Sequence, residues 1–153
     1  EFNEKAAAEK NGNVIIYETG GDHIAAASLN AETRQYGNLD VETEIETVTL
    51  DTFIQTSNID KIDLIKIDVE CHEPNVLEGY KQYLPIHRPD FLVEVLTDEV
   101  GEKLQQLFNG LNYYYFNIDD KQGKIRQTDK IIKSDYFNYL VCTEATAKQL
   151  KLI

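Results

Sequence analysis

The stretch Asp63-Leu-Ile-Lys-Ile-Asp-Val-Glu-Cys-His-Glu-Pro-Asn-Val-Leu-Glu-Gly-Tyr80 determines the fold that the sequence predicts. It begins with the apolar run of a buried strand and continues into a cluster of ionisable side chains. Pro74 and Gly79 then bracket a short apolar segment, and proline is typical of the first turn of a helix as glycine is of its end. We therefore expect a strand, a loop and a short helix, with the ionisable cluster at the carboxyl end of the strand, where ligands bind in open α/β sheets.

A second apolar run, Asp90 to Leu96, has the pattern of a central parallel strand. A helix is expected to begin at Thr97 or Asp98 and to stop at Gly110. The order of strands and helices predicts an α/β fold, with a sheet that is mostly parallel and has antiparallel C-terminal strands. The remaining C-terminal elements are expected to be strands over residues 111–118, 124–128 and 136–143, a turn over 119–123, and a helix over 145–152.

The N-terminal third gives weaker patterns. Residues 4–10 are compatible with one or two helical turns, although an isolated helix of this length is marginal in water. Residues 22–40 show no clear period and are expected to form a loop, with a brief helical option from Ala25 to Leu29. The other expected elements are a strand over 13–19, a strand over 41–48 with a solvated glutamate face, and a helix from Leu50 that is capped by Asp51 and ends at Ser57-Asn58.

Length and composition narrow the class of protein. A chain of 153 residues suits one domain, and a net charge of −12 disfavours nucleic acid and anionic membranes as partners. No apolar run approaches the roughly 20 residues that a membrane span needs. Cys71 and Cys142 make neither a metal pair nor a disulfide framework, so we expect reduced thiols in a cytoplasmic protein. The absence of Met and the abrupt charged start indicate a fragment or a processed chain.

The ionisable cluster allows several chemistries. Asp68 and Glu70 are expected to point together at the carboxyl end of the strand, because residues two apart on a strand face the same side. His72 and Glu73 follow in the loop that enters the helix. If the two apolar strands are neighbours, Glu94 near the end of the second one faces the same mouth. These groups could act as general acid and base, hold a divalent cation, or accept hydrogen bonds from a ligand. A purely structural interpretation also stands, in which Asp68 or Glu73 caps the helix and His72 lies on the surface.

The same residues resemble the FkbM family of S-adenosylmethionine-dependent methyltransferases. The resemblance covers most of this chain but only the later part of the family's domain. The family has Gly where this chain has Cys71. The family's early strand with its glycine-containing loop, and the acidic residue that binds the ribose, have no counterpart in the sequence. The matching segments are Asn11-Gly12-Asn13-Val14, Val48 to Phe53, Ile62 to Glu70, His72-Glu73, Val76 to Gly79, Arg88-Pro89-Asp90 and Val93-Glu94-Val95.

The resemblance implies a Rossmann-like methyltransferase sheet that lacks its N-terminal cofactor-binding strands. Residues 1–153 would form a single domain that is the later part of a larger one. The complete protein would transfer a methyl group from S-adenosylmethionine to a hydroxyl of a small molecule or sugar. Asp68 and Glu70 would be catalytic, and His72, Glu73 and Glu94 would bind the acceptor.

Two alternatives stay open beside the methyltransferase. One is a non-catalytic methyltransferase-like domain that serves in binding or as a scaffold. The other is a carboxylate metal site. Because the cofactor-binding motif is absent from the sequence, we expect the isolated chain to be inactive and to bind S-adenosylmethionine weakly or not at all.

Overall fold

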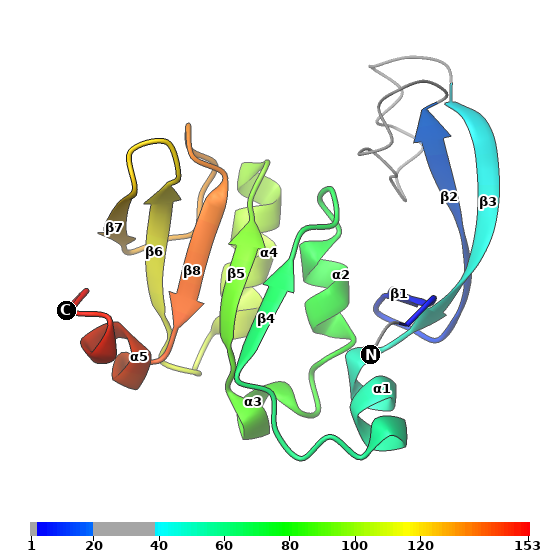
Figure 1. Cartoon of the computed structure of the whole chain (residues 1–153), viewed down its shortest axis with the longest axis horizontal. Helices are drawn as coiled ribbons and strands as arrows, with labels where there is room; N and C mark the ends of the chain where they lie inside the picture. The colour runs from blue at the N-terminus through cyan, green and yellow to red at the C-terminus, as the bar shows by residue number, and fades with distance from the viewer. Residues whose placement is uncertain (1–2, 20–38) are drawn as a thin grey trace.

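The computed structural model describes residues 3–19 and 39–153 and shows two β-sheets with helices packed against the larger one (Figure 1). The larger sheet has the strand order β4-β5-β8-β6-β7 and the smaller one β1-β3-β2. The elements are β1 (Ala6–Ala7), β2 (Gly12–Thr19), β3 (Leu39–Val48), α1 (Leu50–Ser57), β4 (Leu64–Ile67), α2 (Glu73–Glu78), α3 (Leu84–His87), β5 (Asp90–Glu94), α4 (Asp98–Phe108), β6 (Tyr114–Asp119), β7 (Lys124–Thr128), β8 (Asn138–Cys142) and α5 (Glu144–Gln149).

Strand direction in the larger sheet departs from the prediction. β4 and β5 are parallel, whereas β5 with β8, β8 with β6, and β6 with β7 are antiparallel. The expected antiparallel C-terminal strands are therefore confirmed, and the expectation of a mostly parallel sheet is wrong. An apolar run such as β5 indicates that both faces of the strand are buried. It does not indicate whether the neighbouring strands are parallel or antiparallel.

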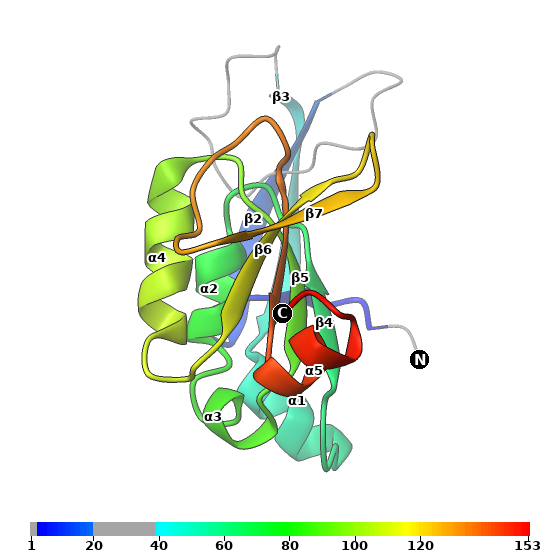
Figure 2. The ribbon, with the colours of Figure 1, turned by 90° about the vertical axis from the view of Figure 1, so that its left-hand side faces the viewer.

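The main core lies between the larger sheet and the two helices α2 and α4. Figure 2 shows these helices on one side of the sheet and α5 on the other. Leu77, Leu104 and Phe108 from the helices are fully buried against Phe91 and Val93 of β5. The opposite face is covered by α5 through a smaller cluster that includes Phe116, Leu140, Cys142 and Ala147.

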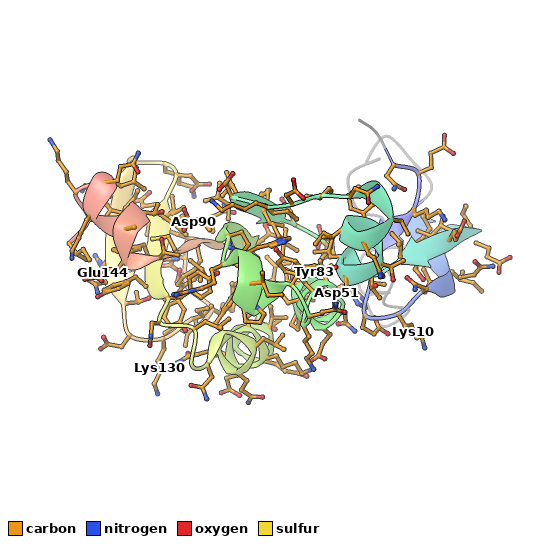
Figure 3. The ribbon with its side chains drawn as sticks, turned by 90° about the horizontal axis from the view of Figure 1, so that it is seen from below. Lys10, Asp51, Tyr83, Asp90, Lys130 and Glu144 are labelled. Atoms are coloured by element: carbon orange, nitrogen blue, oxygen red, sulfur yellow. The ribbon has the colours of Figure 1, made fainter. Side chains whose placement is uncertain are left out.

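Threonine side chains begin three of the helices. The side chain of Thr49 accepts a hydrogen bond from the Thr52 N–H group, so Thr49 and not Asp51 caps α1. Asp51 has a different role, because its carboxylate accepts from the backbone N–H groups of Gln82 and Tyr83 at 3.0 and 3.2 Å. Figure 3 shows Asp51 beside Tyr83. Thr97 and Thr143 cap α4 and α5 in the same way as Thr49 caps α1.

The N-terminal segment is extended rather than helical, so the helix expected over residues 4–10 is wrong. Ala6 and Ala7 pair in parallel with Thr47 and Val48 of β3, and the Ala8 N–H donates to Val48 O at 3.1 Å. Inter-strand hydrogen bonds thus replace those of a helix too short to be stable alone. The predicted loop over 22–40, with its helical option at Ala25 to Leu29, lies outside the described residues except for 39 and 40, which belong to β3.

The strands β2 and β3 form a long antiparallel ribbon, which we call the arm. Their pairing runs from Gly12 opposite Thr47 to Thr19 opposite Leu39. Figure 1 shows the arm projecting away from the larger sheet, with β1 at its base. Within residues 3–19 and 39–153, none of the helices is long and apolar enough to cross a membrane.

Gly79 joins the base of the arm to α2. A β-carbon at Gly79 would lie 2.1 Å from the backbone oxygen of Ala8, and the oxygen of Gly79 accepts from the Asp51 N–H at 2.8 Å. The φ angle of Gly79 is −74°, which any residue adopts. Glycine is therefore required here by close packing and not by backbone conformation.

We expect Gly79→Ala to lower the free energy of unfolding by about 1–3 kcal/mol, because the added methyl group overpacks the contact with Ala8. Urea unfolding measures the change, and hydrogen exchange at the Ala8 amide reports whether the first strand detaches. Glu78→Ala, one residue earlier and exposed, is the matched control. Equal stabilities of the two variants would contradict this account of Gly79.

Candidate functional site

The chain turns sharply after β4. The His72 N–H donates to Val69 O at 3.2 Å, which closes a four-residue turn. Its two central residues, Glu70 and Cys71, both have positive φ angles of 51° and 73°. Because β4 ends at Ile67, Asp68 and Glu70 do not share a strand face as predicted. Each left-handed residue with a β-carbon costs about 1–2 kcal/mol, so the surrounding structure must hold this turn in place.

Glu73 supplies that support. It is the first residue of α2, only 1% of its surface is exposed, and its Oε1 accepts from the Val69 N–H at 3.1 Å. Burial raises the pKa of Glu73, while the backbone N–H groups of Glu73, Val69 and Cys71 act in the opposite direction. Its Oε2 has no hydrogen-bond partner in the part of the chain that the structure describes. Glu73 therefore holds the turn from inside, and its burial does not suit the predicted contact with an acceptor.

Asp68 and Glu94 follow or end two neighbouring strands and lie within electrostatic reach of each other. Asp68 is exposed and is paired with Lys66 at 3.1 Å. Glu94 is half-buried at the end of β5, which lies beside β4 with Val93 opposite Ile67. Burial raises the pKa of Glu94, and the negative charges of Asp68, Glu70 and Glu73 raise it further. The sequence analysis did not identify Lys66, which lies two residues before Asp68 and forms an ion pair with it.

Glu94 is half-buried and has a raised pKa, so it holds a proton more readily than a free carboxyl group. A raised pKa brings a carboxylate closer to the range in which a general base works well. Asp68 and Glu70 surround it with negative charge and can accept hydrogen bonds from a ligand. The arrangement therefore offers carboxylates that can accept hydrogen bonds from a ligand and one, Glu94, whose raised pKa suits proton transfer.

Cys71 and His72 occupy the turn itself. Burial raises the pKa of the Cys71 thiol, and the nearby charges of Glu73, Glu70 and Glu94 add to this. A thiol with a raised pKa stays protonated and is a poor nucleophile. His72 is half-buried, and its Nε2 lacks a hydrogen-bond partner among the described residues. The structure thus places both beside the acids without giving either a direct chemical role.

A metal ion and a nucleotide cofactor fit this part of the chain poorly. Over residues 3–19 and 39–153, His, Cys, Asp and Glu side chains form no group of three or more that could hold a metal ion. The described glycines do not form a cradle for S-adenosylmethionine either. Gly79 and Gly101 pack against backbone oxygens, and Gly12, Gly110 and Gly123 have positive φ angles at the ends or turns of elements.

Comparison with known proteins gives one match. The family model described as the methyltransferase FkbM domain matches residues 2–131. No curated protein and no solved structure matches the chain. The matched range contains the arm, the turn after β4, and the acids Asp68, Glu70 and Glu94.

Replacement of Cys71 tests the strain in the turn. We expect Cys71→Gly to raise the free energy of unfolding by about 1 kcal/mol, because glycine adopts a φ of 73° without the penalty of a β-carbon. Cys71→Ala is the control, since it removes the thiol but keeps the β-carbon. Equal effects of the two substitutions in urea unfolding would show that the backbone angle is not the cause.

Replacement of Glu73 tests the support of the turn. Glu73→Ala should lower the free energy of unfolding by about 1–3 kcal/mol, because the Val69 N–H loses a partly buried acceptor and the Glu73 side chain leaves a buried site. Glu73→Gln keeps an acceptor oxygen, so its free energy of unfolding should fall much less than that of Glu73→Ala.

The parent and Glu73→Gln should also differ in how their free energy of unfolding depends on pH. The folded state binds the proton of Glu73 more tightly than the unfolded state, so its contribution to stability falls as pH rises from 4.5 through the raised pKa. Unfolding curves measured at a series of pH values should be flatter for Glu73→Gln than for the parent. Glu102→Gln, an exposed change on α4, should leave the pH profile unaltered, and an identical profile in Glu73→Gln would refute the assignment.

Proposed function

The chain belongs to the FkbM methyltransferase family, and from this premise we propose that it forms the acceptor-binding side of an S-adenosylmethionine-dependent O-methyltransferase. The acceptor would be a hydroxyl of a small molecule or a sugar. The observation that carries the proposal is the convergence of Asp68, Glu70 and Glu94 at the carboxyl end of the parallel pair β4 and β5, with a raised pKa at Glu94.

In this proposal the carboxylates act on the acceptor oxygen. Asp68 and Glu70 accept hydrogen bonds and fix the orientation of the hydroxyl groups. Glu94 receives the proton of the hydroxyl that reacts, which makes its oxygen a better nucleophile. S-adenosylmethionine supplies the electrophilic methyl group. Lys66 forms an ion pair with Asp68 and so lies beside the acids.

We also propose that residues 1–153 form one unit within a larger methyltransferase domain. The outer edge of β4 has no partner strand in the part of the chain that the structure describes, and Leu64 on it is 56% exposed. The acids lie directly after this edge strand. Further strands beside β4 would cover Leu64 and enclose the acids. They would also provide the cofactor-binding loop that the described glycines do not form.

A second candidate is a non-catalytic methyltransferase-like domain that binds a ligand or serves as a scaffold. It is supported by Cys71, which has a φ of 73° at the position where the FkbM family has glycine.

The two free cysteines and the acidic composition fit a cytoplasmic protein whose partners are not nucleic acids.

Substitution of the acids in the full-length protein that carries this chain tests the catalytic proposal. Glu94→Gln should lower kcat by about 100-fold or more, the usual contribution of general base catalysis. The rate of the parent should rise with pH as Glu94 loses its proton, and this dependence should be absent in Glu94→Gln. S-adenosylhomocysteine formation, measured over a panel of hydroxylated small molecules and sugars, gives the rate.

Asp68→Asn and Glu70→Gln should each weaken turnover, because each removes an acceptor for the hydroxyl. Glu102→Gln on the far side of α4 is the control. Near-normal turnover in both Asp68→Asn and Glu70→Gln would rule out the proposed role of these acids.

Calorimetry of the 153-residue chain tests the proposal of a larger domain. S-adenosylmethionine should bind weakly or not at all, because the described residues supply no nucleotide cradle. Saturable binding in the micromolar range would show that the cradle is present in the chain and would overturn this part of the proposal.

A further inference from the structure

The free sheet edges of this protein differ in how they are protected against pairing with another strand. Natural edge strands are commonly short or carry charged side chains. β3 carries Glu44 and Glu46, and β7 carries Lys124 and Arg126. β4 has only four residues and includes Lys66.

The edge of β2 is long, and its only charged residue, Glu18, lies near its end. The strand has eight residues and is uncharged from Gly12 to Tyr17 (Gly-Asn-Val-Ile-Ile-Tyr). Ile15, near its middle, is 44% exposed. β2 pairs with β3 on one side, and its other side has no partner strand in residues 3–19 and 39–153. Among the free edges described, β2 is therefore the one best suited to accept another strand.

Within the part of the chain that the structure describes, most of the arm is a ribbon of only two strands. A two-stranded ribbon is marginally stable in water, and three or more strands with an apolar face are usually required. One face of the arm carries Val14, Ile16 and Ile45, which are only half-buried. β1 extends the ribbon at its base alone, through Ala6 and Ala7. Figure 1 shows that the rest of the arm stands clear of the larger sheet.

We propose that β2 pairs antiparallel with β2 of a second copy of this chain, so that two arms form one four-stranded ribbon in the order β3, β2, β2, β3. A two-fold axis through the ribbon uses the same edge on both copies, as closed dimers do. The apolar faces of the two arms then join into one. This inference does not depend on the proposed methyl transfer.

Charge explains why a second copy is a suitable partner and why the assembly stops at two. An uncharged edge selects another uncharged strand, and β2 itself meets this requirement. The two glutamate rows of β3 lie at the outer edges, three strand spacings or about 14 Å apart. This exceeds the Debye length of about 8 Å at physiological ionic strength, so their repulsion is largely screened. The same glutamates oppose the addition of further strands.

Sedimentation velocity of the 153-residue chain over a hundredfold range of concentration tests the proposal. We expect a reversible monomer–dimer equilibrium. Ile15→Lys should weaken the dimer at least about tenfold, because it places charges at the shared edge. The arm itself should tolerate the change, since Glu44 lies directly opposite Ile15 and pairs with the new lysine.

Asn13→Lys, opposite Glu46, is a second variant with the same expectation, and circular dichroism confirms that both remain folded. The matched control is Leu64→Lys on the free edge of β4, which should leave the dimer unchanged. A chain that stays monomeric at every concentration would overturn the proposal. So would a dimer that Leu64→Lys weakens and Ile15→Lys does not, because its interface would then lie at β4.

Discussion

The hydrogen bond from the Val69 N–H group to the buried carboxylate of Glu73 is the contact on which the candidate site depends. It crosses the turn that carries Glu70 and Cys71 in left-handed conformations. Those conformations are unfavourable for residues with a β-carbon, and the chain would relax into a more extended loop without an internal acceptor. One buried acid thus supports the turn that carries Glu70.

The larger sheet adds the second half of the site. Parallel pairing of β4 with β5 brings the end of each strand to the same edge, which places Glu94 within electrostatic reach of Asp68 and Glu70. The raised pKa of Glu94 is a result of this placement and of burial. The site therefore arises from two local features, a tight turn and a parallel strand pair, and both lie within the segment that matches the FkbM family.

Most elements of the described chain were predictable from sequence because their signals are local. The strand at β4, the short helix between Pro74 and Gly79, and the helix after Thr97 all have clear periodicity or caps. The direction of β8 was not predictable, since it depends on which strand inserts beside β5. In the site, the convergence of Glu94 with Asp68 followed from strand ends meeting at one edge. The inward position of Glu73 did not, because a residue after a turn carries no sign of the side to which it points.

The packing at both ends of α2 has a mechanical consequence. Its first residue, Glu73, holds the acidic turn, and the glycine that follows its last residue lies against Ala8 and accepts from Asp51. Six helical residues span about 9 Å, and so short a helix has no room to bend. α2 therefore connects the base of the arm to the acidic turn directly, through one short helix that is buried against the larger sheet. A substitution that shifts either end of α2 is thus expected to disturb both the arm and the acidic turn.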